Sequence, residues 1–355
     1  MYKVVWSEKI EKLIGPYHDF IIEILDFVNE EPQFKVRKES DISNLVEKLE
    51  ELKKDKDCKY NFLDIATGTK LKVYICELKY EGINLLEKYK ESVDNYRAFL
   101  SKDWDNSISY SEELTKTFEY FYNNLIHGKI FNKKIGETET TAIRYLREAL
   151  TLESACPYCD IHEMEFDLAS VDHFIPKSQY PLLAIYPKNL VVACSACNDR
   201  IKKDKLYLPI MHPYFDNLDD YFHFTYKNDV IGIEFLEHCS ITDKEKICNF
   251  FKLFNLEERY NKYCKRKLIK LKENIQRNVV KQIIGLEYST IEDIHLKIKE
   301  EIKDQYEIIL KDKKVDSLTK LRLDYLKQLG EGNLIDMGLF IAQECNLSIK
   351  NPYLV

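Results

Sequence analysis

Apolar side chains recur every three or four residues through most of the first 150 residues, which is the spacing of one face of an α-helix. Gly15-Pro16 falls inside the first such segment and predicts a break or a kink there. One run, LKVYICEL at 71–78, is instead typical of a short strand. The helical pattern covers residues 8–30, 41–54, 83–100, 111–127 and 140–153.

The pattern changes between residues 154 and 211, where five of the nine prolines fall. The runs FDLASVDHFI and NLVVAC predict two short strands, and one helix is expected at about 198–206. Beyond them, HFTYKNDVIGIEF predicts a hairpin that turns at 227–229. Asn255 followed by Glu258 matches a capping box that opens a long helix, and helical spacing continues to about residue 345.

These elements predict a predominantly helical α+β chain in three parts. Residues 1–150 form a helical N-terminal region, residues 151–211 a compact module, and residues 212–355 a hairpin followed by helices. The first part carries no motif, so partner docking, regulation and a plain scaffold all remain open for it.

Composition and charge narrow the function classes. Hydrophobic residues make up 45% and charged residues 32% of the 355, which is typical of a globular protein. The chain has no apolar run long enough for a membrane span and no signal-peptide pattern, so we expect a soluble cytoplasmic protein without a membrane partner. The formal net charge of −7 means that any nucleic-acid surface must be a local patch.

Four of the ten cysteines form two CxxC pairs, CPYC at 156–159 and CSAC at 194–197. Zinc prefers four tetrahedral ligands, and each CxxC turn presents two thiolates. Cys156, Cys159, Cys194 and Cys197 therefore predict a closed, structural zinc site. Chance spacing is one alternative, and a redox CxxC is another, although the βαβ pattern that usually carries it is missing here.

The remaining cysteines are scattered. Cys239, Cys248 and Cys264, with His238, are spaced irregularly, so we interpret these three cysteines as free core thiols and not as part of a second metal site. The others are Cys58, Cys76 and Cys345.

Polar residues stand at particular places around the cysteine pairs. Asp172-His173 and Asn189 lie between the pairs, and Asn198 follows Cys197. The order CPYC, VDHFIPKS (171–178) and KNLVVACSACN (188–198) resembles the HNH endonuclease family, whose zinc-bearing members have a ββα-metal fold. The resemblance covers about one sixth of the chain. The runs DHFIPKSQYP, IYPKNL and HPYFD are similar to a bacterial subgroup often found in phage-defence gene pairs.

Phosphodiester hydrolysis needs an activated water and charge neutralisation on the phosphate and the leaving oxygen. A histidine suits the first task, and a divalent cation held by oxygen ligands suits the second. The resemblance implies that His173 is the general base, that Asp172 and Asn198 hold Mg²⁺ or Mn²⁺, and that Asn189 fixes the loop and the orientation of His173. Adjacent strand residues point to opposite faces, so Asp172 and His173 share one site only where the strand ends, and Pro176 predicts such an end.

Each of these polar residues has an ordinary interpretation when taken alone. An Asp-His pair is typical of a solvated turn, and an asparagine is typical of a turn or a helix N-cap. Their joint occurrence within the double CxxC frame favours an active site. His162 is interpreted as an exposed loop residue and His212 as a packing residue.

Lysines near the motif are candidates for phosphate contacts. Lys177 follows the first strand and is either such a contact or a solvated lysine. The family often has a lysine three residues after its helix-starting Asn or His, whereas Ile201 stands there in this chain and Lys202, Lys203 and Lys205 follow. This departure leaves Lys202 without an assigned phosphate role.

A basic segment lies at 262–281, which contains eight basic residues and one acidic residue, Glu273. On a helix, Arg266, Lys267, Lys270 and Arg277 fall opposite an apolar stripe. We predict that these four residues bind nucleic acid. A solvated charged face is the alternative, and a membrane-surface helix would need aromatic anchors that the apolar side lacks.

The sequence therefore predicts a metal-dependent DNA endonuclease with structural zinc, acting in bacterial phage defence, with an ATPase or another defence subunit as a possible partner. The alternatives are a zinc-stabilised module that binds nucleic acid without cutting it and an RNA-cleaving toxin. The sequence does not distinguish DNA from RNA.

Overall fold

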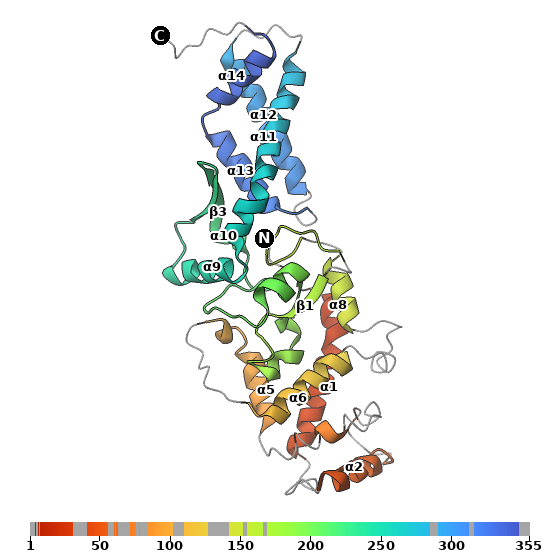
Figure 1. The fold of residues 1–355 in the computed structure, drawn as a ribbon. Helices are drawn as coiled ribbons and strands as arrows, with labels where there is room; N and C mark the ends of the chain where they lie inside the picture. Colours follow the sequence, from red (N-terminus) through yellow and green to blue (C-terminus); the bar gives the residue numbers. More distant parts are fainter. Residues whose placement is uncertain are drawn as a thin grey trace. The chain divides into compact units, whose positions relative to one another are not determined.

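The computed structural model of the chain is predominantly helical with two small antiparallel sheets, as the sequence predicted (Figure 1). The chain divides into an N-terminal unit, Val4–Leu152 with Glu165–Tyr214, and a C-terminal unit, Glu153–Met164 with Phe215–Val355. No helix in the described ranges has the length and apolar character needed to cross a membrane. The structure describes residues 4, 6, 8–30, 41–55, 60, 62, 72–75, 78, 84–101, 110–126, 142–151, 155–165, 169–284, 290–311 and 316–347.

Helices make up the first part of the N-terminal unit, and they follow the predicted amphipathic segments. The helices are α1 (Glu8–Glu30), α2 (Asp41–Leu52), α5 (Leu85–Asp94), the 3₁₀-helix η2 (Ala98–Leu100), α6 (Glu112–Tyr120), the π-helix η3 (Phe121–Ile126) and α8 (Ala142–Thr151).

A predicted break at Pro16 and a predicted strand at 71–78 are wrong in this unit. Helix α1 runs unbroken through Pro16, because its buried apolar face, including Phe20 and Ile24, holds the helix together despite the missing N–H. The predicted strand at 71–78 is helical wherever the structure describes it. Ile75 and Leu78 are both buried there, and their spacing of three suits a helix; a short apolar run does not by itself distinguish the two structures.

The compact module has the order strand, strand, helix. Strand β1 (Ala169–His173) pairs antiparallel with β2 (Leu190–Cys194), so that His173 lies opposite Leu190. Two 3₁₀-helices, η5 (Pro181–Ile185) and η6 (Pro187–Asn189), connect the strands. The π-helix η7 (Ala196–Lys202) follows β2, so the predicted helix begins and ends earlier than 198–206.

The C-terminal unit contains the predicted hairpin. Strand β3 (Phe222–Lys227) pairs with β4 (Val230–Phe235). Asn228 and Asp229 have φ values of 50° and 60°. A two-residue type I′ turn requires positive φ at both residues, and its twist matches that of the flanking strands. The remaining elements are η8 (Leu218–Asp220), α9 (Ile241–Leu253), α10 (Leu256–Arg259), the π-helix η9 (Tyr260–Cys264), α11 (Lys265–Ile283), α12 (Ile291–Lys311), α13 (Thr319–Glu331) and α14 (Ile335–Glu344).

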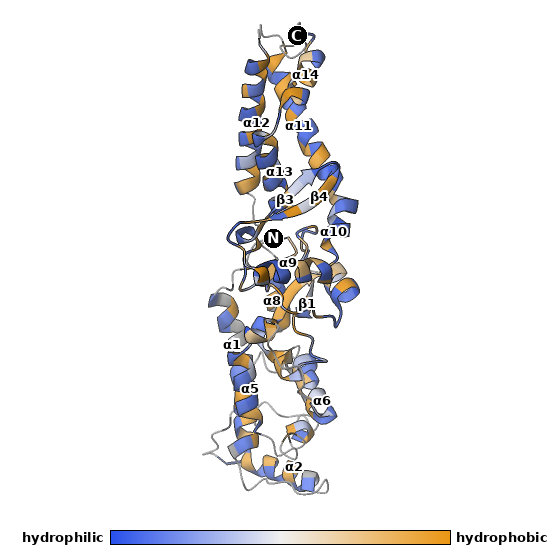
Figure 2. Cartoon of the chain, turned by 90° about the vertical axis from the view of Figure 1, so that its left-hand side faces the viewer, coloured by the Kyte–Doolittle hydropathy of each residue, from blue (hydrophilic) through white to orange (hydrophobic). Residues whose placement is uncertain are grey.

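Helix α11 is amphipathic as predicted. Its buried side includes Leu268, Leu271, Ile275 and Val279, and hydrophobic and hydrophilic residues are interleaved along α11 and α12 (Figure 2). Helix α11 packs against α12 and α14, so this apolar stripe forms part of the core of the C-terminal unit.

The predicted capping box at Asn255 and Glu258 is wrong. Asn255 has a left-handed backbone with φ of 49°, and its side chain makes no capping hydrogen bond to the backbone. Instead, Asn255 Nδ2 donates to Glu258 Oε2 at 2.6 Å. A capping box does occur at the start of α9, where Ser240 and Asp243 exchange side-chain and backbone hydrogen bonds.

Candidate active site

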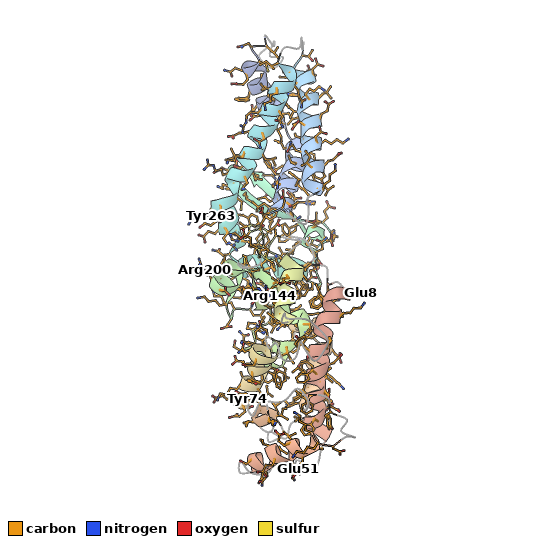
Figure 3. The ribbon with its side chains drawn as sticks, turned by 90° about the vertical axis from the view of Figure 1, so that its right-hand side faces the viewer. Glu8, Glu51, Tyr74, Arg144, Arg200 and Tyr263 are labelled. Carbon is orange, nitrogen blue, oxygen red and sulfur yellow. The ribbon has the colours of Figure 1, made fainter. Side chains whose placement is uncertain are left out.

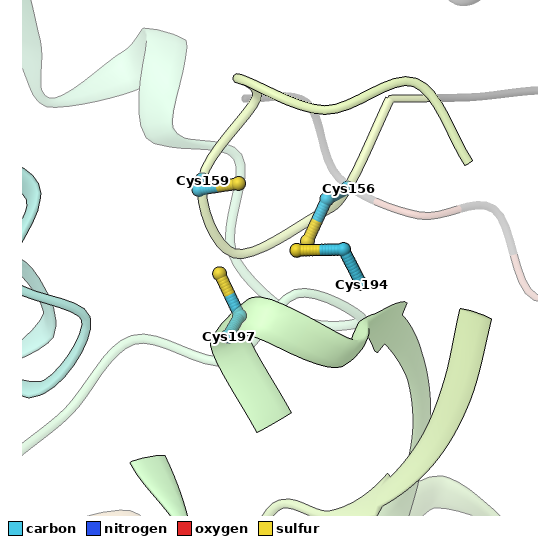
Figure 4. Close-up of side chains that lie close together, drawn as sticks. All are labelled: Cys156, Cys159, Cys194 and Cys197. Carbon is cyan, nitrogen blue, oxygen red and sulfur yellow. The ribbon is translucent and has the colours of Figure 1, made fainter. Parts of the chain in front are cut away.

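Four buried cysteines form a compact sulfur cluster. The Sγ atoms of Cys156, Cys159, Cys194 and Cys197 all lie within 4.8 Å of one another. Figure 4 shows the sulfur atoms directed toward a common centre. Zn–S bonds of about 2.3 Å in a tetrahedron place the sulfurs about 3.8 Å apart, so the cluster has the size and the donor set for one zinc ion.

Backbone hydrogen bonds close the first CxxC turn. The Asp160 N–H donates to the Cys156 carbonyl at 2.8 Å, and the Cys156 N–H donates to the His162 carbonyl at 2.8 Å. His162 is exposed, as predicted, and its Nδ1 lies 3.8 Å from Cys159 Sγ. The turn therefore holds its two cysteines in place through main-chain contacts.

The three other cysteines considered above form no second metal cluster among the described residues. Cys239 Sγ donates to the Tyr221 carbonyl at 3.0 Å, and Cys248 is exposed. Burial raises the pKa of the Cys264 thiol to about 12, with the nearby Cys159 adding to the effect. Cys239 and Cys264 are buried, as core thiols are, but the prediction of a core thiol is wrong for Cys248, which lies on an exposed face of α9.

A buried ion pair joins β1 to η7. Lys202 Nζ donates to Asp172 Oδ1 at 2.9 Å and to the His173 carbonyl at 2.8 Å. Beside it, Asn198 Nδ2 donates to Ser170 Oγ at 3.0 Å. Ser170 and Asp172 are two residues apart and share one face of the strand, so Asn198 and Lys202 fasten η7 to that face.

Lys202 lies four residues after Asn198 in η7. Residues four apart lie on the same side of a helix, so both side chains reach the same strand face. Because its ammonium group is buried against Asp172, Lys202 is not exposed to a phosphate, in line with the absence of an assigned phosphate role.

Histidine 173 is the last residue of β1, so the predicted strand end is confirmed. Its Nε2 lies 2.9 Å from the Ala184 carbonyl. A carbonyl oxygen only accepts, so in the neutral ring Nε2 carries the proton and Nδ1 is the basic nitrogen. The imidazole also meets the Tyr122 ring edge-on, with 4.3 Å between centroids.

Asparagine 189 is fully buried and ties the segment after β1 to η5. Its Nδ2 donates to the Ile175 and Leu183 carbonyls, both at 3.0 Å. Its Oδ1 accepts from the Ile175 N–H at 2.8 Å and from the Tyr96 hydroxyl at 2.9 Å. The predicted loop-fixing role of Asn189 thus has a matching geometry.

The donor set of Asp172 and Asn198 fits a hard divalent cation, which prefers carboxylate and amide oxygens. Asn198 Nδ2 is turned to Ser170, and Asn198 Oδ1 accepts no hydrogen bond from the described residues. Lys202 donates to Oδ1 of Asp172. The assignment of both residues as cation ligands stays a prediction.

The predicted nucleic-acid residues lie in two places. Lys177 is partly buried, with its Nζ 5.3 Å from the centre of the Tyr122 ring and 3.9 Å from Glu119 Oε1. In the C-terminal unit, the four basic residues predicted on α11, here called the basic face, are all exposed. These are Arg266, Lys267, Lys270 and Arg277.

Sequence reasoning missed the residues of the N-terminal helices that surround the module. Tyr96 bonds Asn189, and Tyr122 contacts His173. Burial raises the pKa of Tyr122, and the Asp172 carboxylate adds to the effect, so its hydroxyl stays protonated. The sequence places both tyrosines in predicted amphipathic segments, and a buried hydroxyl needs a hydrogen-bonding partner. The sequence pattern does not identify that partner.

A cysteine cluster, a two-stranded sheet followed by a helix, and a histidine at the end of the first strand define a zinc-type HNH nuclease module. The sequence model of the HNH endonuclease family matches residues 156–204. Protein ea31 of Escherichia phage lambda is 30% identical over 209 residues, which are 51% of this chain and 69% of that protein. The chain belongs to the HNH endonuclease family, and its substrate class is nucleic acid. No solved structure matches the chain.

Proposed function

We propose that this protein is a metal-dependent endonuclease that hydrolyses DNA phosphodiester bonds with His173 as the general base. The observation that carries the proposal is the contact of 2.9 Å between His173 Nε2 and the Ala184 carbonyl in an HNH module. With the proton on Nε2, Nδ1 is the basic nitrogen of His173, and as general base it would take a proton from the attacking water. The half-buried imidazole is held in orientation by Ala184 and Tyr122.

Asp172 and Asn198 are the residues that would hold Mg²⁺ or Mn²⁺. When bound, such a cation stabilises negative charge on the phosphate and on the leaving oxygen. Lys202 holds the Asp172 carboxylate in place from the η7 side, and Ser170 does the same for the Asn198 amide. The four cysteines would hold a structural zinc that fixes β2 and η7 relative to the first CxxC turn.

Plasmid nicking by the full chain tests this proposal, with Mg²⁺ or Mn²⁺ added or withheld. The His173→Ala variant should cleave about 10²- to 10⁴-fold more slowly, because a general base contributes that much, while zinc content and melting temperature stay unchanged. His162→Ala is the matched control, since His162 is an exposed histidine outside β1. Cleavage by His173→Ala at the wild-type rate would contradict the proposal.

Two further arms separate the alternatives. A wild-type protein that binds DNA but nicks no substrate with either cation would favour a zinc-stabilised binding module. Structured RNA offered beside the plasmid tests an RNA-cleaving toxin, which would cut the RNA faster than the DNA.

We also propose that the basic face binds the DNA backbone. Arg266, Lys267 and Lys270 form no ion pair with any other described residue, so their charge is available to phosphates. Tyr263, labelled in Figure 3, is 61% exposed just before α11 and can stack on a base or a sugar. Lys177 is a weaker candidate, because Glu119 partly neutralises it.

A role in bacterial phage defence in the cytoplasm, alone or with an ATPase, is supported by the resemblance of DHFIPKSQYP and HPYFD to a defence-linked subgroup. The relative reported above is itself a phage protein. Plaque assays on cells that express the wild type or His173→Ala test this role. Protection that requires His173 supports defence, and equal plating on both strains contradicts it.

A further inference from the structure

We infer that Tyr96 and His212 are positioning residues for His173 and act on it through Asn189; the inference rests on the proposed function. The three side chains form a buried chain of hydrogen bonds. His212 Nε2 lies 3.1 Å from the Tyr96 hydroxyl, and that hydroxyl lies 2.9 Å from Asn189 Oδ1. Tyr96 is 2% exposed, and His212 and Asn189 are fully buried.

The donor and the acceptor in each hydrogen bond among His212, Tyr96 and Asn189 are determined. The Tyr214 N–H donates to His212 Nδ1 at 3.1 Å, so Nδ1 is an acceptor and the ring proton sits on Nε2. Burial, together with the nearby Arg97 charge, lowers the pKa of His212 to about 3, so the ring stays neutral. His212 therefore donates to the Tyr96 oxygen, and the Tyr96 hydroxyl donates to Asn189.

The Tyr96 hydroxyl is one of four partners that favour a single orientation of the Asn189 amide. In the observed orientation Oδ1 faces two donors, the Tyr96 hydroxyl and the Ile175 N–H. In the same orientation Nδ2 faces two acceptors, the Ile175 and Leu183 carbonyls. A flipped amide would set donor against donor at the Ile175 N–H and acceptor against acceptor at the Ile175 and Leu183 carbonyls. The Tyr96 hydroxyl proton would also lose its acceptor, so buried polar groups would be left unsatisfied.

The two segments that Asn189 holds are those that orient His173. Ile175 lies two residues after His173, so its position fixes the backbone that carries the imidazole. Leu183 directly precedes Ala184, whose carbonyl accepts from His173 Nε2. A displacement of either segment would move Nδ1 of His173 relative to the water that it deprotonates. Misplacement of a catalytic group by about 1 Å can cost about 10²-fold in rate.

Aromatic packing around Tyr96 is separable from its hydroxyl. The Tyr96 ring meets Tyr186 at 5.0 Å, and the His212 ring meets Phe174 at 4.4 Å. Tyr96→Phe retains the ring contacts of residue 96 and removes only the hydroxyl that bridges His212 and Asn189. The loss of that hydroxyl is therefore the specific perturbation for a test.

The experiment compares Tyr96→Phe with Tyr260→Phe in Mg²⁺-dependent cleavage of a duplex oligonucleotide. Tyr260 also has a buried hydroxyl, which donates to the Cys159 carbonyl at 2.8 Å. It is not part of the hydrogen-bond network of Tyr96, His212 and Asn189. We expect kcat of Tyr96→Phe to fall about 10- to 10²-fold with KM and zinc content unchanged. Tyr260→Phe should keep the wild-type kcat. Both variants can have a lower melting temperature than the wild type, and kcat is compared for the folded proteins.

Two substitutions of His212 give a second, independent arm. His212→Gln places an amide N–H near the position of Nε2 and can still donate to Tyr96. His212→Asn reaches only the position of Nδ1. We expect kcat to be higher for His212→Gln than for His212→Asn, at equal KM. The comparison of the two His212 variants also tests the positioning role if Tyr96→Phe fails to fold.

The outcomes distinguish this inference from the proposed function. An inactive His173→Ala together with a fully active Tyr96→Phe would overturn the positioning role and leave the general base in place. Equal kcat values for the two folded His212 variants would also overturn it. A fully active His173→Ala would remove the proposed function and this inference with it.

Discussion

Lys202 Nζ lies 2.9 Å from Asp172 Oδ1, and both side chains are buried between β1 and η7. Asp172 directly precedes the proposed general base, and Lys202 also donates to the carbonyl of His173. Asp172 is thus held by a positive charge of the protein itself. Breaking a buried ion pair by removing one partner is costly, because the other charge stays buried without compensation.

Lys202→Met is therefore expected to lower the free energy of unfolding by about 3–5 kcal/mol, as measured by urea denaturation of the zinc-loaded protein. Lys205→Met is the control, since Lys205 is an exposed lysine three residues after Lys202. The double variant Asp172→Asn/Lys202→Met should regain part of the loss, because no uncompensated charge remains. Equal stability of Lys202→Met and Lys205→Met would show that the pair is not a stabilising feature.

Purified protein should contain about one zinc ion per chain, because the four clustered cysteines have the donor set and the spacing that a closed zinc site requires. Cys194→Ala should lose the zinc and unfold the module, since zinc binding contributes directly to folding. Metal analysis and circular dichroism measure both effects. Cys248→Ser, a change at an exposed cysteine outside the cluster, should keep the zinc. Absence of zinc from protein purified without chelators would contradict this prediction.

Replacing Arg266, Lys267, Lys270 and Arg277 by Gln should weaken DNA binding for all sequences. Each phosphate contact contributes roughly 0.9 to the slope of log affinity against log salt, so the slope should flatten by about two to four units. Fluorescence anisotropy at several salt concentrations measures the slope. Cleavage at saturating DNA should persist.

The matched control for the basic face changes the same net charge elsewhere in the C-terminal unit. Lys299, Lys303, Lys311 and Lys327 are exposed on α12 and α13, and their replacement by Gln should leave the slope nearly unchanged. Identical slopes for the two quadruple variants would mean that the basic face of α11 makes no specific contribution.

The buried His212 should make folding stability depend on pH. Burial lowers its native pKa to about 3, below its ordinary value of about 6.5. Below pH 6.5 the unfolded state takes up a proton that the native state refuses, so stability falls as the pH drops toward 3. The contribution lost between pH 6.5 and pH 5 is about 1.5 kcal/mol.

Urea denaturation at pH 6.5 and at pH 5 measures that loss. His212→Gln has no titrating ring and should show a smaller decrease than the wild type over this interval. His18, whose pKa is also lowered by burial, contributes equally to both proteins. Parallel pH dependence in the two proteins would indicate that the native pKa of His212 is not lowered.

Local patterns were predictable where a short stretch of sequence contains its own structural cause. The CxxC spacing predicted the cysteine cluster, Asn228-Asp229 the hairpin turn, and Pro176 the end of β1. Propensity failed where packing outweighs it. Helix α1 continues through Pro16, and residues 72–75 are helical although their composition suits a strand.

The sequence by itself determined the family, the two strands and helix of the module, and the four cysteines that cluster beside them. Only the tertiary structure decided which partners the polar residues of the module have. Tyr96 and Asn189 are 93 residues apart, and Lys202 and Asp172 are 30 apart. Periodicity shows that a side chain is buried but not what it is buried against. A buried polar group must find a hydrogen-bonding partner, and only the packing of distant segments decides which one it finds.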